Sequence, residues 1–313
     1  MTLPVDFLAE PATDIRIQRL DFLSLKLPEY VGLYAYVLDN CLTPEECQTL
    51  LRAVEHRASH TWERAMINVG SGRQAMAMDV RNCGRIIWDD SQVVAKIWKR
   101  VEHLLPDIAR LENQGRVTGL GPVRRGEVWT LKRLNERMRF LKYEGGEYFK
   151  RTHDDDRARL VSHTDRDAAH YDGVYQTPDG SERSYFTLHL YLNGTLDDTQ
   201  LATMQPEQRH VAMETSCKGG ATPFFSEDEQ IRCDIDPRPG RILIFQHRDL
   251  LHSGDDVLQG VKYTMRTDIM YERNHVPEEE GKNGEPRDAP IPKPKQALKA
   301  NRSRRRYLVQ KTS

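Results

Sequence analysis

The first 60 residues contain one extended and one helical hydrophobic pattern. Residues 31–40, VGLYAYVLDN, alternate well enough to predict a strand. The next stretch, 43–58, predicts a helix. Thr43 is a good N-cap, Pro44 suits the first helical position, and Glu46 can complete a capping box. The buried stripe expected for this helix comprises Leu50, Leu51 and Val54.

A second helix is predicted over residues 91–111. Its apolar side chains recur at helical spacing, as Val94, Ile97 and Val101 show, and Pro106 is expected to end or bend it. Between the two helices lies a glycine-rich loop that leads into a short extended piece, RIIW.

From Glu127 the chain changes to short β-branched and aromatic runs, interrupted by Gly and Pro. Two helices followed by many short strands predict an α+β arrangement, in which helices buttress a β-sandwich. The clearest strand-containing runs are residues 128–150, 184–193, 240–247 and 261–271.

Composition describes a polar globular protein without a strong charge preference. Of 313 residues, 46 are Lys or Arg and 47 are Asp or Glu, so there is no strong nucleic-acid signal. No apolar run approaches the roughly 20 residues of a membrane span, which excludes a predicted membrane anchor. The sequence says nothing about oligomeric state.

Terminal patterns and cysteines bear on the compartment. The start MTLPVDFLAEPATD lacks the basic and apolar regions of a secretion signal. Five cysteines form no C-x-x-C pair, which favours reduced thiols and a cytoplasmic or nuclear location. Residues 273–313 are rich in Pro and charge, so they are expected to form a disordered basic tail.

A His-x-Asp pattern provides candidate metal ligands. Side chains at i and i+2 of a strand point the same way, so an imidazole and a carboxylate can share one metal ion. With one further His they form the two-His-one-carboxylate face that holds Fe(II). Three such pairs occur: His153/Asp155, His163/Asp165 and His170/Asp172. The pattern alone does not choose among them.

Several blocks in order resemble the prolyl 4-hydroxylase-like Fe(II)/2-oxoglutarate-dependent dioxygenase family. They are YEGGEYFK, HYDG, SYFTLHLYLN, GGATPFF and PGRILIFQH followed by LHSGDDVLQGVKYTMRTDIMY. The resemblance covers roughly residues 30–272 and is strongest after residue 135. It implies a double-stranded β-helix, or jelly-roll barrel, buttressed by the N-terminal helices.

The resemblance also implies a set of site residues. His170, Asp172 and His252 take the places of the metal ligands, since HYDGVY and SYFTLHLYLN align without gaps. Lys262, ten residues after His252, becomes the partner of the far carboxylate of 2-oxoglutarate. Arg266 shares the strand face of Lys262 by even spacing and is the second candidate for that role.

Other residues receive weaker assignments. Tyr143 and Thr187 are candidate hydrogen-bond donors to the same co-substrate. His189 and His247 lie in predicted strands and are expected to be ordinary, partly buried histidines rather than ligands. Residues 219–225, GGATPFF, are expected to form a turn and strand that support the barrel without a catalytic role.

One segment departs from the family pattern. In the family, an F-K-P-H-x-D stretch brings the aromatic residue almost directly to the first ligand, whereas here residues 151–169 intervene. They form either a surface insertion or a translated, in-frame intron. If the Arg151 codon is CGT and Ala168–Ala169 is GCA-GCA, splicing from GT to AG would restore Phe-Lys-Pro-His-Tyr-Asp, and the gene sequence tests this. The alternative assignment makes His153 and Asp155 the ligands, at the cost of the family spacing to SYFTLHLYLN.

These observations predict an enzyme that uses Fe(II), 2-oxoglutarate and O₂, and the resemblance allows for ascorbate. It would hydroxylate a protein side chain, prolyl-like, or a small molecule, and decarboxylate 2-oxoglutarate to succinate. The expected organisation is an N-terminal extension (1–30), the dioxygenase domain (31–272) and the tail. The alternative is a catalytically silent jelly-roll binding protein whose basic tail contacts acidic partners.

Overall fold

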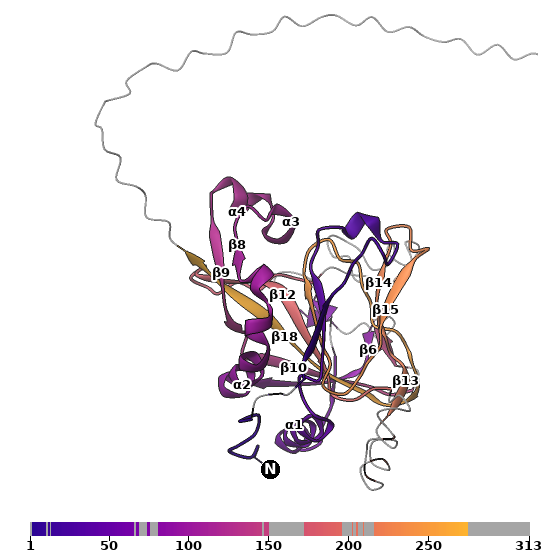
Figure 1. The fold of residues 1–313 in the computed structure, drawn as a ribbon. Coiled ribbons are helices and arrows are strands. Elements are labelled where there is room, and N and C mark those ends of the chain that lie inside the picture. The colour runs from indigo at the N-terminus through magenta and orange to yellow at the C-terminus, as the bar shows by residue number, and fades with distance from the viewer. Residues whose placement is uncertain are drawn as a thin grey trace, which may run out of the picture. The chain divides into compact units, whose positions relative to one another are not determined.

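The computed structural model describes residues 2–10, 12, 14–65, 67–68, 74–75, 81–145, 147–149, 172–195, 202, 205, 209 and 216–274. The chain divides into two units, Met1–Val276 and Pro277–Ser313. The fold described below is that of the first unit (Figure 1). The segment 151–169, the candidate ligand His170 and tail residues 275–313 lie outside the described residues, so the predictions made for them stay predictions.

A large antiparallel sheet forms the centre of the first unit. Its main path runs β1-β2-β16-β12-β18-β10-β7-β3, while β9 pairs with β18 and β8 pairs with β9. The bounds are β1 Arg16–Arg19, β2 Ala35–Asp39, β3 Glu63–Arg64, β7 Gly84–Asp89, β8 Arg110–Leu111, β9 Val128–Leu134, β10 Arg137–Tyr143, β12 Glu182–Tyr191, β16 Ile242–Gln246 and β18 Lys262–Asn274.

Four two-stranded sheets complete the β structure of the described residues. Two of them, β13 with β17 and β14 with β15, follow β12 in the chain. The bounds are β4 Ile67–Asn68, β5 Gln74–Ala75, β6 Arg81–Asn82, β11 Tyr148–Phe149, β13 Cys217–Gly219, β14 Thr222–Phe225, β15 Arg232–Ile235 and β17 Val257–Gly260.

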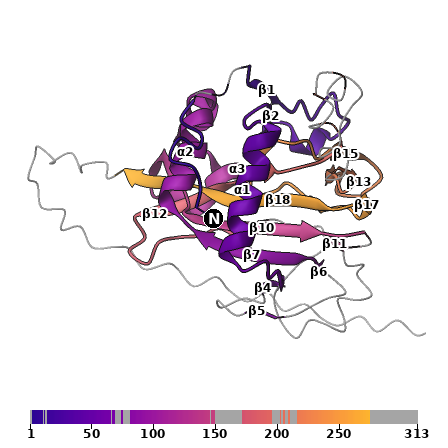
Figure 2. The same cartoon turned by 90° about the horizontal axis from the view of Figure 1, so that it is seen from below.

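The helices α1 (Pro44–Arg57) and α2 (Ser91–Val101) cover one face of the large sheet (Figure 2). The predicted capping box is confirmed, since Thr43 Oγ1 accepts from the backbone N–H of Glu46 and the Glu46 side chain accepts from that of Thr43. Two short helices, α3 (Gly115–Thr118) and α4 (Leu120–Arg124), precede β9. No helix in the described part is both long and apolar enough to cross a membrane.

The second predicted helix is shorter than expected. Its α-helical part ends at Val101, and 3-10 turns at Glu102–Leu104 and Pro106–Ile108 continue the chain. Pro106 therefore opens a new turn rather than ending the α-helix. The predicted strand at 31–40 is confirmed as β2, and the RIIW piece lies in β7.

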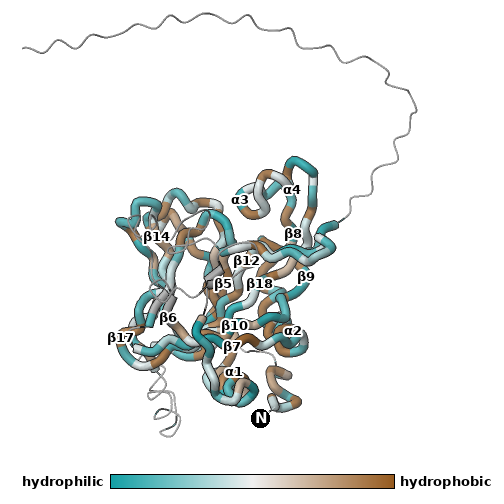
Figure 3. The backbone as a smooth tube through the Cα atoms, turned by 180° about the vertical axis from the view of Figure 1, so that it is seen from behind, coloured by the Kyte–Doolittle hydropathy of each residue, from teal (hydrophilic) through white to brown (hydrophobic). Residues whose placement is uncertain are grey.

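Alternation along β12 separates two hydrophobic environments. Phe186, Leu188 and Leu190 face the cluster under α1 and α2. Tyr191 belongs to a second cluster, on the opposite face of the sheet, which also contains Phe224 of β14 and Ile235 of β15. Figure 3 shows β14 and α1 on opposite sides of β12 and β10. The fold is thus a mixed α/β arrangement around a large antiparallel sheet.

The segment expected to be an N-terminal extension joins this second cluster. Strand β1 pairs with β2, and Leu20, Phe22 and Leu27 are buried against the sheet. The part of this segment from Arg16 to Tyr30 is therefore packed against the large sheet.

Packing of the core under the helices predicts which substitutions will lower the stability of the protein. Phe140 is 0% exposed and stacks against Trp88 with ring centroids 6.3 Å apart. We expect Phe140→Ala to lower the free energy of unfolding by about 3–5 kcal/mol, because it removes a buried aromatic ring and leaves a cavity. Urea denaturation measures this. Ile87→Ala, on neighbouring β7 with 42% exposure, is the control and should cost about 1 kcal/mol or less. Equal losses in both variants would contradict the proposed core.

Candidate metal centre

A cavity lies between the large sheet and the segment around β14. Strands β10, β12, β16 and β18 supply its floor, and residues 252–254 supply its opposite wall. Its lining residues are Leu141, Tyr143, Asp172, His189, Thr222, Phe245, His252, Ser253, Gly254, Lys262 and Arg266. Five of the site residues predicted from the sequence therefore line one cavity: Tyr143, Asp172, His252, Lys262 and Arg266.

Backbone pairing with β14 fixes the position of His252. Phe224 forms an isolated antiparallel bridge with His252, and the N–H of Ser253 donates to the carbonyl of Pro223 at 3.2 Å. The His252 ring also lies 4.6 Å from the Phe245 ring, centroid to centroid. The GGATPFF segment, predicted to support the barrel, thus holds a candidate ligand in place.

The start of β12 fixes Asp172 in a similar way. The N–H of Tyr175 donates to Ser184 Oγ, and the N–H of Ser184 donates to the Tyr175 carbonyl, each at 2.8 Å. The Asp172 side chain is 2% exposed. Its Oδ2 accepts a 2.5 Å hydrogen bond from Thr187 Oγ1. Thr187, predicted to bind the co-substrate, contacts this candidate ligand instead.

The ring nitrogens of His252 have different surroundings. Nδ1 lies 3.0 Å from the carbonyl oxygen of Leu250, so it is the nitrogen that donates. That tautomer leaves the Nε2 lone pair facing Asp172 Oδ2, 3.9 Å away. A metal-binding histidine is held in this way by a carbonyl on its other nitrogen. The donor set therefore fits a divalent metal ion at these two atoms.

Arg266 pairs with the other oxygen of the same carboxylate. Its Nη2 lies 2.6 Å from Asp172 Oδ1 and 3.4 Å from Thr187 Oγ1. Both residues are largely removed from water, so the pair is a charge-assisted hydrogen bond in a site of low polarity. Arg266 was the second candidate for the co-substrate anchor, and its described partner is instead a candidate metal ligand.

Lys262 is the most isolated charge in the cavity. It is 2% exposed, and among the described residues no carboxylate lies within ion-pairing distance. Its Nζ lies 5.3 Å from the centre of the Tyr143 ring and 5.6 Å from that of Tyr191. Burial lowers the pKa of Lys262 to about 8.

Gly220 makes room for the lysine stem. Its φ is +70°, and a Cβ there would lie 2.9 Å from Lys262 Cδ. Glycine is thus required both by the backbone and by the close approach. The second glycine of the GGATPFF motif, Gly220, therefore lies directly against a residue of the site.

Two further residues of β12 face the cavity side. His189 is partly buried, as expected, and its buried Nε2 has no hydrogen-bond partner among the described residues. Burial, followed by the charge of Lys262, lowers its pKa well below the usual value. Tyr191 donates to Thr222 Oγ1 at 2.7 Å. Strict alternation through Thr187 would have placed both residues on this face.

His247 is more deeply buried than expected, and it is not among the residues that line this cavity. Its Nε2 is 3.7 Å from Asp268 Oδ1, and burial lowers its pKa. The part of the chain that the structure describes contains no group of three potential metal-binding residues. Asp172 and His252 are thus described as a pair, and the predicted third ligand, His170, lies outside the described residues.

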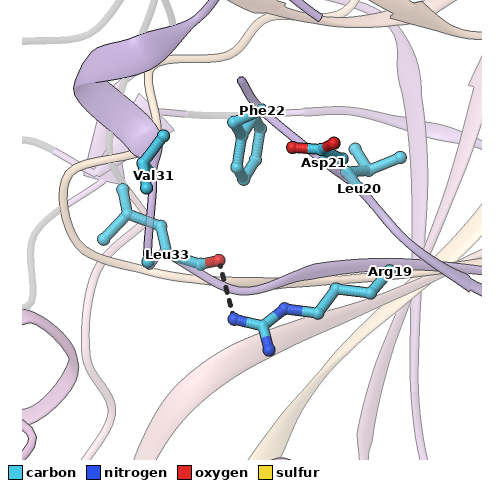
Figure 4. A pocket seen from close by; sticks show the side chains of 7 residues that line it. Arg19, Leu20, Asp21, Phe22, Val31 and Leu33 are labelled. Carbon is cyan, nitrogen blue, oxygen red and sulfur yellow. Dashed lines mark hydrogen bonds between the residues drawn. The ribbon is translucent and has the colours of Figure 1, made fainter. Parts of the chain in front are cut away.

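A second pocket lies where the N-terminal residues meet the turn before β2 (Figure 4). Arg19 and Asp21 are its charged residues, and Arg19 Nη2 donates to the Leu33 carbonyl at 3.5 Å. None of the candidate metal ligands lines this pocket, so the candidate site is the first cavity.

Comparison with known proteins returned matches among solved structures. A viral collagen prolyl hydroxylase from Paramecium Bursaria Chlorella virus-1 matches at 16% identity and a TM-score of 0.41, covering 77% of this chain and 98% of its own. A Pseudomonas putida prolyl 4-hydroxylase matches at 14% identity and a TM-score of 0.43, and the match covers 79% of this chain and 97% of the hydroxylase. A Trichoplax adhaerens prolyl hydroxylase, in complex with a hypoxia inducible factor peptide, matches at 15% identity and a TM-score of 0.45. The match covers 79% of this chain and 88% of the hydroxylase.

The chain resembles the prolyl 4-hydroxylase-like dioxygenases. No family model and no curated protein matches the chain. Superpositions this loose transfer no residue role, so the roles of the site residues depend on the geometry given above.

Burial of Lys262 predicts that the stability of the folded protein depends on pH. Below pH 8 Lys262 is charged in both the folded and the unfolded protein, so the free energy of unfolding is lowered by the full cost of burying that charge. Between pH 8 and 10.5 the folded state releases the proton first, so the stability of the wild-type protein should rise. We therefore expect Lys262→Met to be more stable than wild type by up to about 3 kcal/mol at pH 7.

The advantage of Lys262→Met should shrink toward zero near pH 10. Urea unfolding of both proteins at pH 7, 8.5 and 10 measures the difference. Groups common to the two proteins cancel in this comparison. A difference that stays constant across the range would show that Lys262 is not buried as a charge.

Proposed function

We propose that the protein is an Fe(II)/2-oxoglutarate-dependent dioxygenase that hydroxylates a protein side chain, prolyl-like, or a small molecule. One observation carries the proposal. A buried imidazole and carboxylate, with Nε2 and Oδ2 turned toward each other, share a cavity with a buried lysine that has no described carboxylate partner. A metal ion would bind the first pair, and the carboxylate of a chelating acid would bind the lysine.

His252 Nε2, Asp172 Oδ2 and the predicted third ligand His170 would hold the metal. Iron bound there supplies the redox chemistry that couples decarboxylation of 2-oxoglutarate to succinate with hydroxylation of the substrate, and ascorbate would keep it reduced. Thr187 and Arg266 orient the Asp172 carboxylate through one contact to each oxygen.

Lys262 would bind the far carboxylate of 2-oxoglutarate. A buried ammonium beside two aromatic faces gains strongly from such a partner, because no water screens the pair. Tyr143 lines the same end of the cavity, while Leu141 and Phe245 exclude water from its walls. Tyr191 and Thr222 form a hydrogen-bonded pair at that end and extend the predicted co-substrate set.

The jelly-roll barrel is part of the same proposal. Strands β13, β14, β15 and β17 would form the smaller sheet that faces the large one, with the cavity between them. The dioxygenase domain would then comprise residues 31–272, with β1 and the segment after it packed against its sheet. The segment 151–169 directly precedes the predicted ligands His170 and Asp172, so we expect its presence to affect activity.

The first test is anaerobic addition of Fe(II) and 2-oxoglutarate, followed by the visible charge-transfer band of the chelate. We expect the band in the wild-type protein and its loss in Asp172→Ala, His252→Ala and His170→Ala. His153→Ala is the matched control and should keep it. Loss in His153→Ala but not in His170→Ala would reassign the ligands.

A deletion of residues 151–168 combined with Ala169→Pro extends this test to the inserted segment. A band of similar strength in both proteins would indicate a tolerated surface insertion. A band in the deletion protein alone would indicate a translated intron. Absence of the band from both would reject the dioxygenase proposal.

A second prediction concerns the anchor. Lys262→Met should weaken 2-oxoglutarate binding by about 10- to 100-fold, since it removes a charge-assisted hydrogen bond. Titration of the band with 2-oxoglutarate measures the affinity. Lys142→Met is the control, because Lys142 lies on the opposite face of the same strand pair and bonds to Glu144. Comparable weakening in both variants would exclude a specific anchor at Lys262.

A further inference from the structure

The charges of the described residues that line the metal cavity do not balance. Among its described lining residues, Lys262 and Arg266 are cationic and Asp172 is anionic. His189 could add only positive charge, and burial lowers its pKa well below the usual value, so it is counted as neutral. This part of the lining therefore carries a net positive charge before any metal ion enters.

The positive charge of Arg266 lies in direct contact with a candidate metal ligand, Asp172. Its Nη2 is 2.6 Å from Asp172 Oδ1, and the hydroxyl of Thr187 bonds to Oδ2. A metal ion bound through Oδ2 would thus be separated from the guanidinium by a single carboxylate group. The guanidinium orients this carboxylate, but it also reduces the negative charge available to a cation and repels the cation directly.

A doubly negative 2-oxo acid changes this balance. Its far carboxylate offsets Lys262, and its metal-chelating end brings negative charge to the region beside Arg266. The same guanidinium that opposes a bare metal ion would therefore favour a metal ion that arrives with the acid. The two ligands should assist each other's binding, since a coupling between two sites acts equally in both directions.

We propose that Arg266 makes divalent metal binding depend on the 2-oxo acid, so that the cavity holds the metal weakly alone and tightly as a pair with the acid. The inference rests on the proposed function and adds a role for Arg266 that the co-substrate anchor does not include. Arg266 is in this sense a positioning residue, which acts through the Asp172 carboxylate.

The test measures Mn(II) binding, which involves no turnover. The free Mn(II) signal in electron paramagnetic resonance gives the dissociation constant with and without saturating 2-oxoglutarate. For the wild-type protein we expect 2-oxoglutarate to tighten Mn(II) binding by about 30-fold or more. In Arg266→Gln, Mn(II) alone should bind about tenfold more tightly than in wild type, and the effect of 2-oxoglutarate should fall to about threefold.

Arg139→Gln is the matched control. Arg139 is the direct cross-strand partner of Arg266, but its described ion pair is with Asp268 at 3.4 Å. Its removal takes away an equal charge from the same face without touching Asp172, so the coupling should change by less than about threefold. An equal change in both variants would overturn the role assigned to the Arg266–Asp172 contact.

Arg266→Lys keeps the charge and provides a variant with milder structural consequences. It should retain most of the wild-type coupling, and a loss as large as in Arg266→Gln would reject the charge argument. Weaker rather than tighter Mn(II) binding in Arg266→Gln would mean that orientation outweighs repulsion, which also overturns the inference. Failure of the wild-type protein to bind Mn(II) even with 2-oxoglutarate would instead reject the proposed function.

Discussion

The two-residue alternation of β12 and β18 is the constraint on which the rest of the structure depends. On one face these strands present Phe186, Leu188 and Met265 to the core under the helices. On the other face they present Thr187, Lys262 and Arg266 to the cavity side. A register shift of one residue would place charged groups in the core and apolar groups in the site. Burial of the apolar face therefore fixes the position of the polar one.

The cavity face is costly to fold, and this cost is informative. A buried lysine without a described carboxylate, a neutral histidine with an unpartnered nitrogen and a buried Arg–Asp pair all lose hydration. A protein selected only for stability would fill these positions with apolar side chains. The concentration of such groups in one cavity is characteristic of a binding site whose ligands supply the missing partners.

Sequence reasoning predicted the elements and several site residues for identifiable reasons. The capping box at Thr43 and the alternation of β12 are local signals, so they were accessible without the fold. The pairing of Arg266 with Asp172 was not, since it joins β18 to the segment before β12, and their relative position depends on the whole sheet. The same holds for Thr187, which bonds to Asp172.

The spacing of the two cations on β18 argues for different roles. Lys262 and Arg266 are four positions apart in an extended strand, a distance of roughly 13 Å along the strand. Arg266 is engaged at the Asp172 end, whereas Lys262 lies at the end lined by Tyr143 and Tyr191. A short dicarboxylate chelated beside Asp172 would direct its free end toward one of them only. The cation already paired with a ligand carboxylate is the weaker candidate, so the geometry favours Lys262 as the anchor.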